Sequence, residues 1–233
     1  MAISHSILSA VSGGELGPTL RLHVPGAMVA FGRSDRVTPG YPGAVRAARA
    51  HGFSAVERLA GGRAAVFHES TIAFSLALPE PEPKTGIHER FELISAIMVD
   101  AFVSLGIDAR VGEIRGEYCP GQWSVNVGGK VKVMGVGQRL VRRAAHIGGV
   151  VVVDDGERIR DVLIPVYRAL GLDWDPRTAG SLADRSPGLT TEIVMEGILD
   201  QFRRHYPMVE GAIGSDLLRN AESLLGDHLP QVA

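Results

Sequence analysis

The order in which apolar patterns follow one another along the chain constrains its fold more than any other feature. Alternating or continuous apolar runs predict strands on both sides of one long stretch with helical spacing, residues 88–105. Further helices are expected after residue 190. This order predicts an α+β protein with a mixed, mainly antiparallel β-sheet flanked by helices.

The individual elements follow from the same patterns and from the Gly- and Pro-rich turns between them. Strands are expected over residues 19–24, 27–31, 53–58, 64–78, 109–113, 123–127, 130–134 and 147–153. Helices are expected over residues 42–51, 88–105, 159–170, 191–206 and 215–225.

Charge and hydropathy exclude several classes of function. The chain has 24 basic and 26 acidic residues and a net charge of −2, so it lacks the signature of a protein that binds nucleic acid. No apolar run approaches the roughly 20 residues that cross a bilayer, so no membrane partner is expected. Residues 1–17 lack the pattern of an export signal. Together with a single cysteine, these features predict a cytoplasmic protein.

Cys119 is the only cysteine among the 233 residues. Without a partner for an internal disulfide, it is either a packed small side chain or a nucleophile. It precedes Pro120 and Gly121 in a loop-like stretch, thirteen positions before Lys132. A nearby ammonium group favours the thiolate, which is the reactive form.

A second candidate feature is the pair Gly61-Gly62, which lies between Arg58 and Arg63 and precedes an alternating run. Glycine allows the backbone to approach a ligand closely, and arginine can neutralise an anionic group. A simple hairpin turn has the same pattern. The segment therefore leaves a binding turn and a structural turn open.

Several other kinds of chemistry find no support. The chain has no phosphate-binding P-loop, no complete dinucleotide fingerprint and no Gly-x-Ser-x-Gly motif. Its histidines lack paired spacing for zinc, so no metal site is expected.

Three stretches in this order resemble the lipoate–protein ligase and octanoyltransferase family, which also includes biotin–protein ligases. Gly61-Gly62-Arg63 followed by His68 is similar to the Gly-Gly-Arg form of the first family motif. The second motif, Lys-x-x-Gly-x-Ala/Gly-Gln, fits Lys132, Gly135, Gly137 and Gln138, and residues 31–35 resemble an earlier strand end. The similarity covers residues 18–172. The Asn-Met-x-x-Asp helix with which the family begins is not evident in residues 1–17.

The resemblance implies a biotin/lipoate-ligase-like fold and transfer of an octanoyl or lipoyl group to a lysine of a lipoyl carrier domain. Such carriers are the E2 subunits of 2-oxoacid dehydrogenases and the glycine cleavage H protein, and acyl carrier protein is a possible donor. Cys119 aligns with the nucleophile of the cysteine-dependent octanoyltransferases and Lys132 with the family lysine; Lys130 fits the spacing less well. The implied substrate-binding residues are Arg58, Gly61, Gly62, Arg63, His68, Gly135, Gly137, Gln138 and Gly148.

Two alternatives stay open. A lipoate–protein ligase would use ATP and Mg²⁺ to form lipoyl-adenylate, and Cys119 would be incidental. A non-catalytic lipoate- or acyl-binding protein is the third reading, because the spacing near His68 and His146 departs from the family pattern. The transferase is favoured by the Gly-Gly-Arg motif and by the short stretch after residue 172. Residues 1–172 are expected to form the catalytic domain, and residues 173–233 a helical extension packed on it.

Overall fold

The computed structural model describes residues 1–232 and contains both of the expected kinds of element. The helices are α1 (Ala2–Gly13), α2 (Arg33–Arg36), α3 (Tyr41–Ala50), α4 (Ile87–Ser104), α5 (Gly156–Leu170), α6 (Thr191–His205) and α7 (Ser215–Ser223), with short 3₁₀ turns η1 (Pro176–Thr178) and η2 (Leu225–His228). The strands are β1 (Thr19–His23), β2 (Met28–Phe31), β3 (Ser54–Glu57), β4 (Ala65–Phe67), β5 (Thr71–Pro79), β6 (Ala109–Val111), β7 (Val125–Val127), β8 (Val131–Val141) and β9 (Ala144–Val152).

The strands form two sheets instead of the single sheet that we expected. The larger sheet has the order β1-β5-β9-β8-β7-β6, and all of its neighbouring strands are antiparallel. The smaller sheet has the order β3-β2-β4, in which β2 is parallel to β3 and antiparallel to β4. The prediction of a mixed, mainly antiparallel α+β fold is therefore correct.

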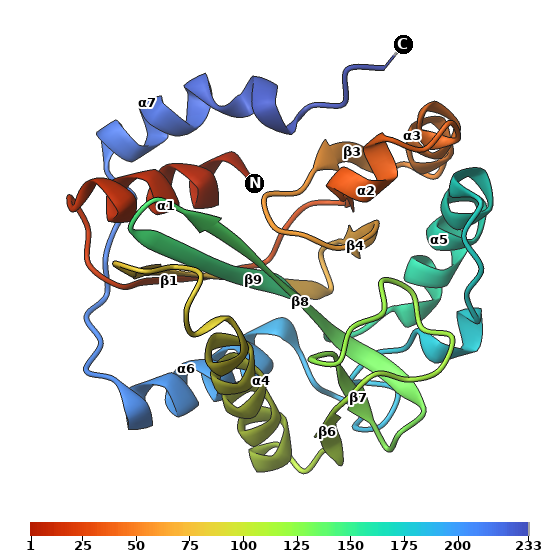
Figure 1. Ribbon diagram of the computed structural model, residues 1–233. Coiled ribbons are helices and arrows are strands. Elements are labelled where there is room, and N and C mark those ends of the chain that lie inside the picture. Colours follow the sequence, from red (N-terminus) through yellow and green to blue (C-terminus); the bar gives the residue numbers. More distant parts are fainter. Residues whose placement is uncertain (233) are drawn as a thin grey trace.

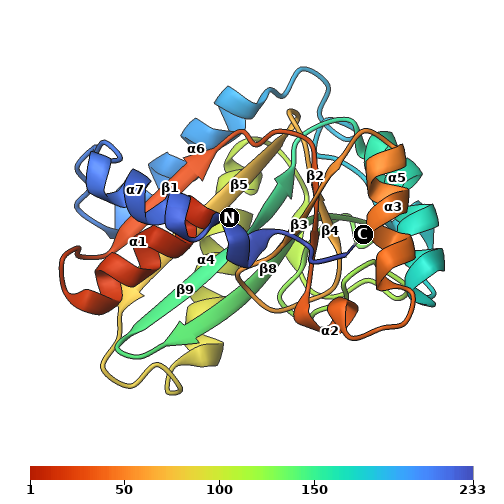
Figure 2. The ribbon, with the colours of Figure 1, turned by 90° about the horizontal axis from the view of Figure 1, so that it is seen from above.

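Helices cover both outer faces of this arrangement. Helices α4 and α6 pack on one face of the larger sheet, and α1 with α7 lies over the opposite face (Figure 1). The smaller sheet lies between the larger sheet and the pair α3 and α5 (Figure 2). Strand β5 is buried on both faces: Ile72 and Phe74 point toward α4, whereas Ala73 contacts the smaller sheet.

The strand expected over residues 64–78 is two strands in different sheets. A turn interrupts it after His68, where the Thr71 N–H donates to the His68 carbonyl oxygen (2.9 Å). Apolar character alone does not reveal this break, because both halves are buried. Strand β8 also continues to Val141, well beyond the expected end at Met134, despite the glycines that make a strand prediction weak there.

Residues 1–17 do contain a helix, although the family motif is absent from it. Helix α1 buries Ile7, Leu8 and Val11 against β5 and β9. It ends at Gly14, whose φ of 83° closes the helix in the left-handed conformation that glycine tolerates. The helical spacing of these apolar residues and the glycine after them are the sequence signals from which this helix could have been predicted.

The residues after 172 complete the core. Val194, Ile198 and Phe202 of α6 are buried against α4, and α7 packs on α1. The boundary at residue 172 stays a prediction. Within residues 1–232, no helix combines the length and the apolar character needed to cross a membrane.

Candidate active site

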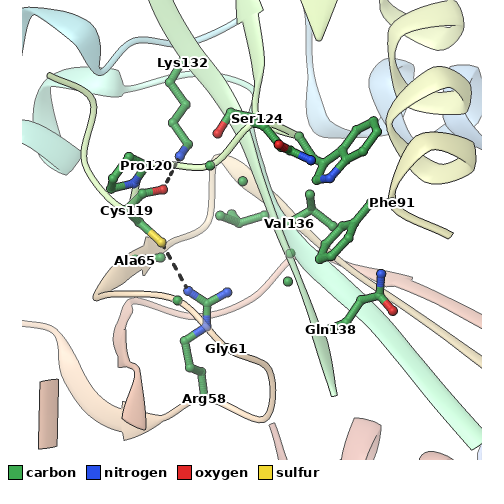
Figure 3. Close-up of a pocket in the computed structure, with 18 of the residues that line it drawn as sticks. Arg58, Gly61, Ala65, Phe91, Cys119, Pro120, Ser124, Lys132, Val136 and Gln138 are labelled. Carbon is green, nitrogen blue, oxygen red and sulfur yellow. Dashed lines mark hydrogen bonds between the residues drawn. The ribbon is translucent and has the colours of Figure 1, made fainter. Parts of the chain in front are cut away.

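A cavity of about 640 Å³ opens where the two sheets diverge, beside the N-terminal end of α4 (Figure 3). Strand β8 forms one wall, β4 contributes a second, and the loop between β6 and β7 forms a third. The lining residues are Arg58, Gly61, Gly62, Ala65, Phe67, Ile87, His88, Phe91, Tyr118, Cys119, Pro120, Gly121, Gln122, Trp123, Ser124, Lys132, Gly135, Val136, Gly137, Gln138, Leu140, Gly149 and Val150.

The three family motifs lie against one another beside this cavity because glycines let their backbones approach closely. The Gly61 N–H donates to the Gln138 carbonyl oxygen (3.3 Å). A Cβ on Gly137 would lie 2.8 Å from the Gly61 oxygen, and one on Gly32 would overlap the Gly62 oxygen. Side chains at either position would therefore push the glycine turn away from β8 or β2.

The sulfur of Cys119 points toward this turn (Figure 3). It accepts a hydrogen bond from the Arg63 backbone N–H (3.1 Å) and a longer one from Nη1 of Arg58 (3.8 Å). Arg58 Nη1 also donates to the Arg63 carbonyl oxygen (2.9 Å). The sulfur therefore lies at the cavity wall with two N–H donors directed at it, a position from which a nucleophile can reach a bound carbonyl.

Lys132 is buried and makes three hydrogen bonds. Its Nζ donates to Glu117 Oε1 (2.8 Å), to the Tyr118 carbonyl oxygen (3.0 Å) and to the Cys119 carbonyl oxygen (2.7 Å). An ammonium group has three N–H donors, so all of them are directed at the cysteine loop. Lys130, two residues earlier, is exposed. The two lysines therefore differ completely in environment.

Glu117 is a site residue that the sequence motifs do not reveal. It is fully buried, and its Oε1 accepts from both Lys132 Nζ and the Ser124 hydroxyl (2.6 Å). Its Oε2 accepts from the Ile114 N–H (2.9 Å). The Lys132 side chain runs beside Gly135, where an added Cβ would lie 3.4 Å from Lys132 Cε, an ordinary van der Waals contact. The only sequence signal for Glu117 is its position two residues before Cys119.

The part of the cavity farther from the sulfur is apolar. Phe91 and Trp123 stack with their ring centroids 6.2 Å apart, and Val136 and Leu140 of β8 line the same space. A concave site with an apolar wall and a few convergent polar groups is typical of a small-molecule pocket. This end of the cavity is suited to a hydrocarbon chain.

Eight of the eleven predicted site residues line the cavity: Arg58, Gly61, Gly62, Cys119, Lys132, Gly135, Gly137 and Gln138. Arg63 reaches Cys119 through its backbone, whereas its side chain pairs with buried Asp35 (3.3 Å). The structure does not bring His68 and Gly148 to the cavity lining. The ring of His68 accepts from the Ser70 N–H in the turn between β4 and β5.

Gly148 lies on β9 beside a second, small cavity of about 40 Å³. His146 also lines that space, and its Nε2 lies 3.0 Å from the Ser75 hydroxyl. Arg58 lines both cavities and therefore lies between the small cavity and the sulfur of Cys119.

Comparison with known proteins identifies the family. Residues 1–203 match the lipoyl protein ligase A/B catalytic domain. The chain belongs to this family. The family prediction made from the three motifs is therefore confirmed, and the match begins at the N-terminal helix that the motifs had missed.

Two curated members of the lipoyl protein ligase A/B family align with almost the whole chain. Octanoyl-[GcvH]:protein N-octanoyltransferase of Geobacillus kaustophilus is 28% identical over 231 residues, which cover 95% of this chain and 80% of that protein. Lipoyl-[GcvH]:protein N-lipoyltransferase of Listeria monocytogenes is 26% identical over 222 residues, with coverage of 88% and 78%.

Solved structures of the family share the fold. A crystal structure of lipoate-protein ligase A bound with ATP superposes with a TM-score of 0.77 at 17% identity and covers 97% of this chain and 87% of that chain. A bi-partite lipoate protein ligase from Thermoplasma acidophilum gives 0.74 at 17% identity, with coverage of 97% and 86%. At these identities the likeness establishes the lipoate-ligase fold.

Gly62 is the position of the family turn at which a side chain should be most harmful. Its φ is 115°, and a Cβ would lie 3.0 Å from Cys119 Sγ and 2.8 Å from Arg58 Nη1. In Gly62→Ala the sulfur must therefore move by a few tenths of an ångström or more. We expect the rate of acyl transfer to fall by about 100-fold as a result. The check is a steady-state rate beside a melting curve.

Gly61→Ala is the matched control, because a Cβ at Gly61 meets nothing within 4 Å and its φ is not positive. It should lose far less activity than Gly62→Ala. Equal losses in the two variants would contradict the steric explanation.

His146 should make the folded state sensitive to acid. Burial, helped by the charge of Arg58, lowers the pKa of His146 to about 4. In the unfolded chain a histidine titrates near pH 6.5, so below that pH only the unfolded state gains the proton. The contribution of His146 to the free energy of unfolding should be fully present above pH 6.5. It should fall by about 2 kcal/mol when the pH is lowered to 5.

Thermal or urea unfolding of wild type and His146→Gln at pH 7 and pH 5 provides the measurement. The variant should lose less stability between the two pH values than the wild-type protein does. Identical pH dependence in both would show that His146 does not bind its proton differently in the two states.

Proposed function

We propose that this protein transfers an octanoyl or lipoyl group to a lysine of a lipoyl carrier domain through a Cys119 acyl-thioester. The observation that carries the proposal is the position of the Cys119 sulfur, which meets the Arg63 N–H and Arg58 at the polar end of an apolar cavity. The names of the curated relatives describe acyltransferases that act on GcvH, and they support a carrier protein as the partner.

The proposed acyl transfer has two steps. In the first, the Cys119 thiolate attacks the acyl carbonyl on the donor carrier, the bond to the donor breaks, and the donor group takes up the proton that the thiol lost. In the second, an acceptor lysine attacks the thioester, an amide forms, and the sulfur leaves as a thiolate while the amine releases its proton. Splitting the transfer lets one cavity serve the donor and the acceptor in turn.

The apolar wall and the glycine turn have separate roles in this proposal. The wall of Phe91, Trp123, Val136 and Leu140 receives the hydrocarbon chain. Arg58 and the Gly61-Gly62 turn lie next to the sulfur, where the acyl carbonyl develops charge. Preorganised donors at such a position are the usual source of transition-state stabilisation in acyl transfer.

Two features of the site bear on the ligase alternative. The lipoate-protein ligase of similar fold binds ATP, so the fold itself is compatible with a nucleotide. In this chain, however, the lysine of the second motif is directed at the cysteine loop, and the sulfur occupies the polar end of the cavity. The transferase therefore accounts for a cysteine that the ligase leaves without a role.

The deciding experiment supplies two alternative acyl sources to the wild-type protein with an E2 lipoyl domain as acceptor. Octanoylated glycine cleavage H protein should add one octanoyl mass to the acceptor without ATP. Octanoylated acyl carrier protein, tested in parallel, identifies the donor. Modification of the acceptor only with free lipoate, ATP and Mg²⁺ would establish the ligase, and no modification from any source would favour a binding protein.

A further inference from the structure

Tyr167 of α5 joins the two backbone segments that hold the nucleophile. Its ring is buried, and its hydroxyl oxygen accepts a hydrogen bond from the Cys119 N–H (2.9 Å). The same hydroxyl donates to the carbonyl oxygen of Ala64 (3.0 Å). One phenol group therefore connects the cysteine loop with the glycine turn, although these segments are more than fifty residues apart in sequence.

The backbone of Cys119 needs such support. Its φ is 44°, in the left-handed region that residues other than glycine seldom adopt. A conformation of this kind persists only when the surrounding structure holds it, and it is concentrated at functional sites. Here the N–H of Cys119 is held by Tyr167 and its carbonyl oxygen by Lys132 (2.7 Å). The two bonds restrain the residue from both sides.

The second bond of Tyr167 acts on the donor that faces the sulfur. Ala64 directly follows Arg63, whose N–H lies 3.1 Å from Cys119 Sγ. Holding the Ala64 carbonyl therefore also holds the Arg63 N–H in place. Burial raises the pKa of Tyr167 well above its usual value of 10, so the phenol keeps the proton that it donates. The link between the loop and the turn is consequently present throughout the neutral pH range.

We propose that Tyr167 is a positioning residue for acyl transfer, because its hydroxyl sets the Cys119 sulfur against the Arg63 N–H. The inference rests on the proposed role of Cys119 as acyl carrier. Tyr167 does not touch the acyl group; it acts through the backbone of the nucleophile. A purely structural role, through packing of its ring against Trp174 (5.6 Å between ring centroids), predicts no effect on the chemistry once the protein is folded.

Tyr167→Phe removes the hydroxyl and keeps the ring. The matched control is Tyr41→Phe, because Tyr41 is buried in the same hydrophobic cluster and its hydroxyl donates to Glu57, away from the sulfur. Both variants lose hydrogen bonding by a buried phenol, so both should melt at a lower temperature than the wild type. Octanoylation of Cys119 by octanoylated carrier is then followed by intact mass in a single turnover, over a range of carrier concentrations.

The maximal acylation rate of Tyr167→Phe should fall by about 10- to 100-fold. The carrier concentration that gives half of that rate should stay the same, and Tyr41→Phe should acylate like the wild type. A wild-type rate in Tyr167→Phe, or an equal loss in both variants, would overturn the positioning role while leaving the Cys119 adduct established. Absence of an adduct in the wild-type protein would instead overturn the proposed function, and this inference with it.

A measurement on the wild-type protein covers the case in which Tyr167→Phe does not fold. The Cys119 amide hydrogen should exchange slowly with solvent, because it is bonded to a buried phenol oxygen. Slow exchange at that amide supports the link between loop and turn. Exchange as fast as in an open loop would show that the bond does not hold the nucleophile, and would overturn the proposal.

Discussion

Cys119→Ser should form no octanoyl adduct when incubated with octanoylated carrier, whereas the wild-type protein should gain one octanoyl mass. A serine hydroxyl at this position has the same donors around it, Arg63 N–H and Arg58, but it is a far weaker nucleophile near neutral pH. Transfer to the acceptor should fall by at least about 10⁴-fold, the scale on which loss of a catalytic nucleophile acts.

The chemistry of the adduct provides a second test. A thioester on sulfur is cleaved by hydroxylamine, so this reagent should remove the octanoyl mass from the wild-type protein. The chain has no other cysteine, so a hydroxylamine-labile mass can be assigned to Cys119 without further mapping. Treatment with the acceptor lipoyl domain should remove the same mass and place it on the acceptor at a matching rate.

Cys119→Ser also separates the two enzymatic readings. If the variant still joins free lipoate to a carrier with ATP and Mg²⁺ as fast as the wild type does, the cysteine is not on the reaction path. The membership of the lipoyl protein ligase A/B family would stand after that result. The transferase mechanism would not, and Cys119 would be a packed residue at the cavity wall.

The sequence located the polar end of this site because its signals are local. Cys119, the Gly61-Gly62 turn and the series from Lys132 to Gln138 were singled out by their resemblance to family motifs, and the fold brings them to one cavity. One element of the motif has a steric cause, since a Cβ at Gly137 would lie 2.8 Å from the Gly61 carbonyl oxygen. A requirement for glycine at a fixed position produces a motif that can be recognised in the sequence.

The sequence pattern does not reveal which side chains bond to or pack against these residues. Tyr167 lies on an amphipathic helix, where its spacing indicates only that it faces the core. Its two hydrogen bonds depend on how α5 packs against the smaller sheet, which local patterns do not encode. Phe91 likewise falls within the helix expected over residues 88–105, and only the structure shows that it lies in the cavity wall beside Trp123.

Lys132→Met should lower the free energy of unfolding of the protein and abolish acyl transfer. The resemblance of the second motif points to a part for Lys132 in the chemistry, and the structure shows that it also belongs to the buried interior. Its side chain is 1% exposed and pairs with Glu117, which is fully buried. Removing one partner of a buried ion pair leaves the other charge uncompensated, at a cost of about 3–5 kcal/mol. Lys130→Ala, on an exposed neighbour, should change neither property.

Stability and catalysis can be separated by neutralising Glu117 as well. In Lys132→Met/Glu117→Gln no charge remains buried at this position, and the glutamine can still accept a hydrogen bond from Ser124 or Ile114. The melting temperature of the double variant should therefore recover most of what Lys132→Met loses. Unfolding curves of the two single variants and the double variant give the coupling between the residues.

Acyl transfer should not recover with stability, if the ammonium of Lys132 acts on the acyl carbonyl next to Cys119. In the present arrangement its three N–H groups bond to Glu117, Tyr118 and Cys119, so a carbonyl must take the place of one of these acceptors. One such donor is worth about 3–4 kcal/mol in the transition state, equivalent to roughly 10²- to 10³-fold in rate. A stable double variant with the wild-type acylation rate would show instead that Lys132 serves only to neutralise Glu117.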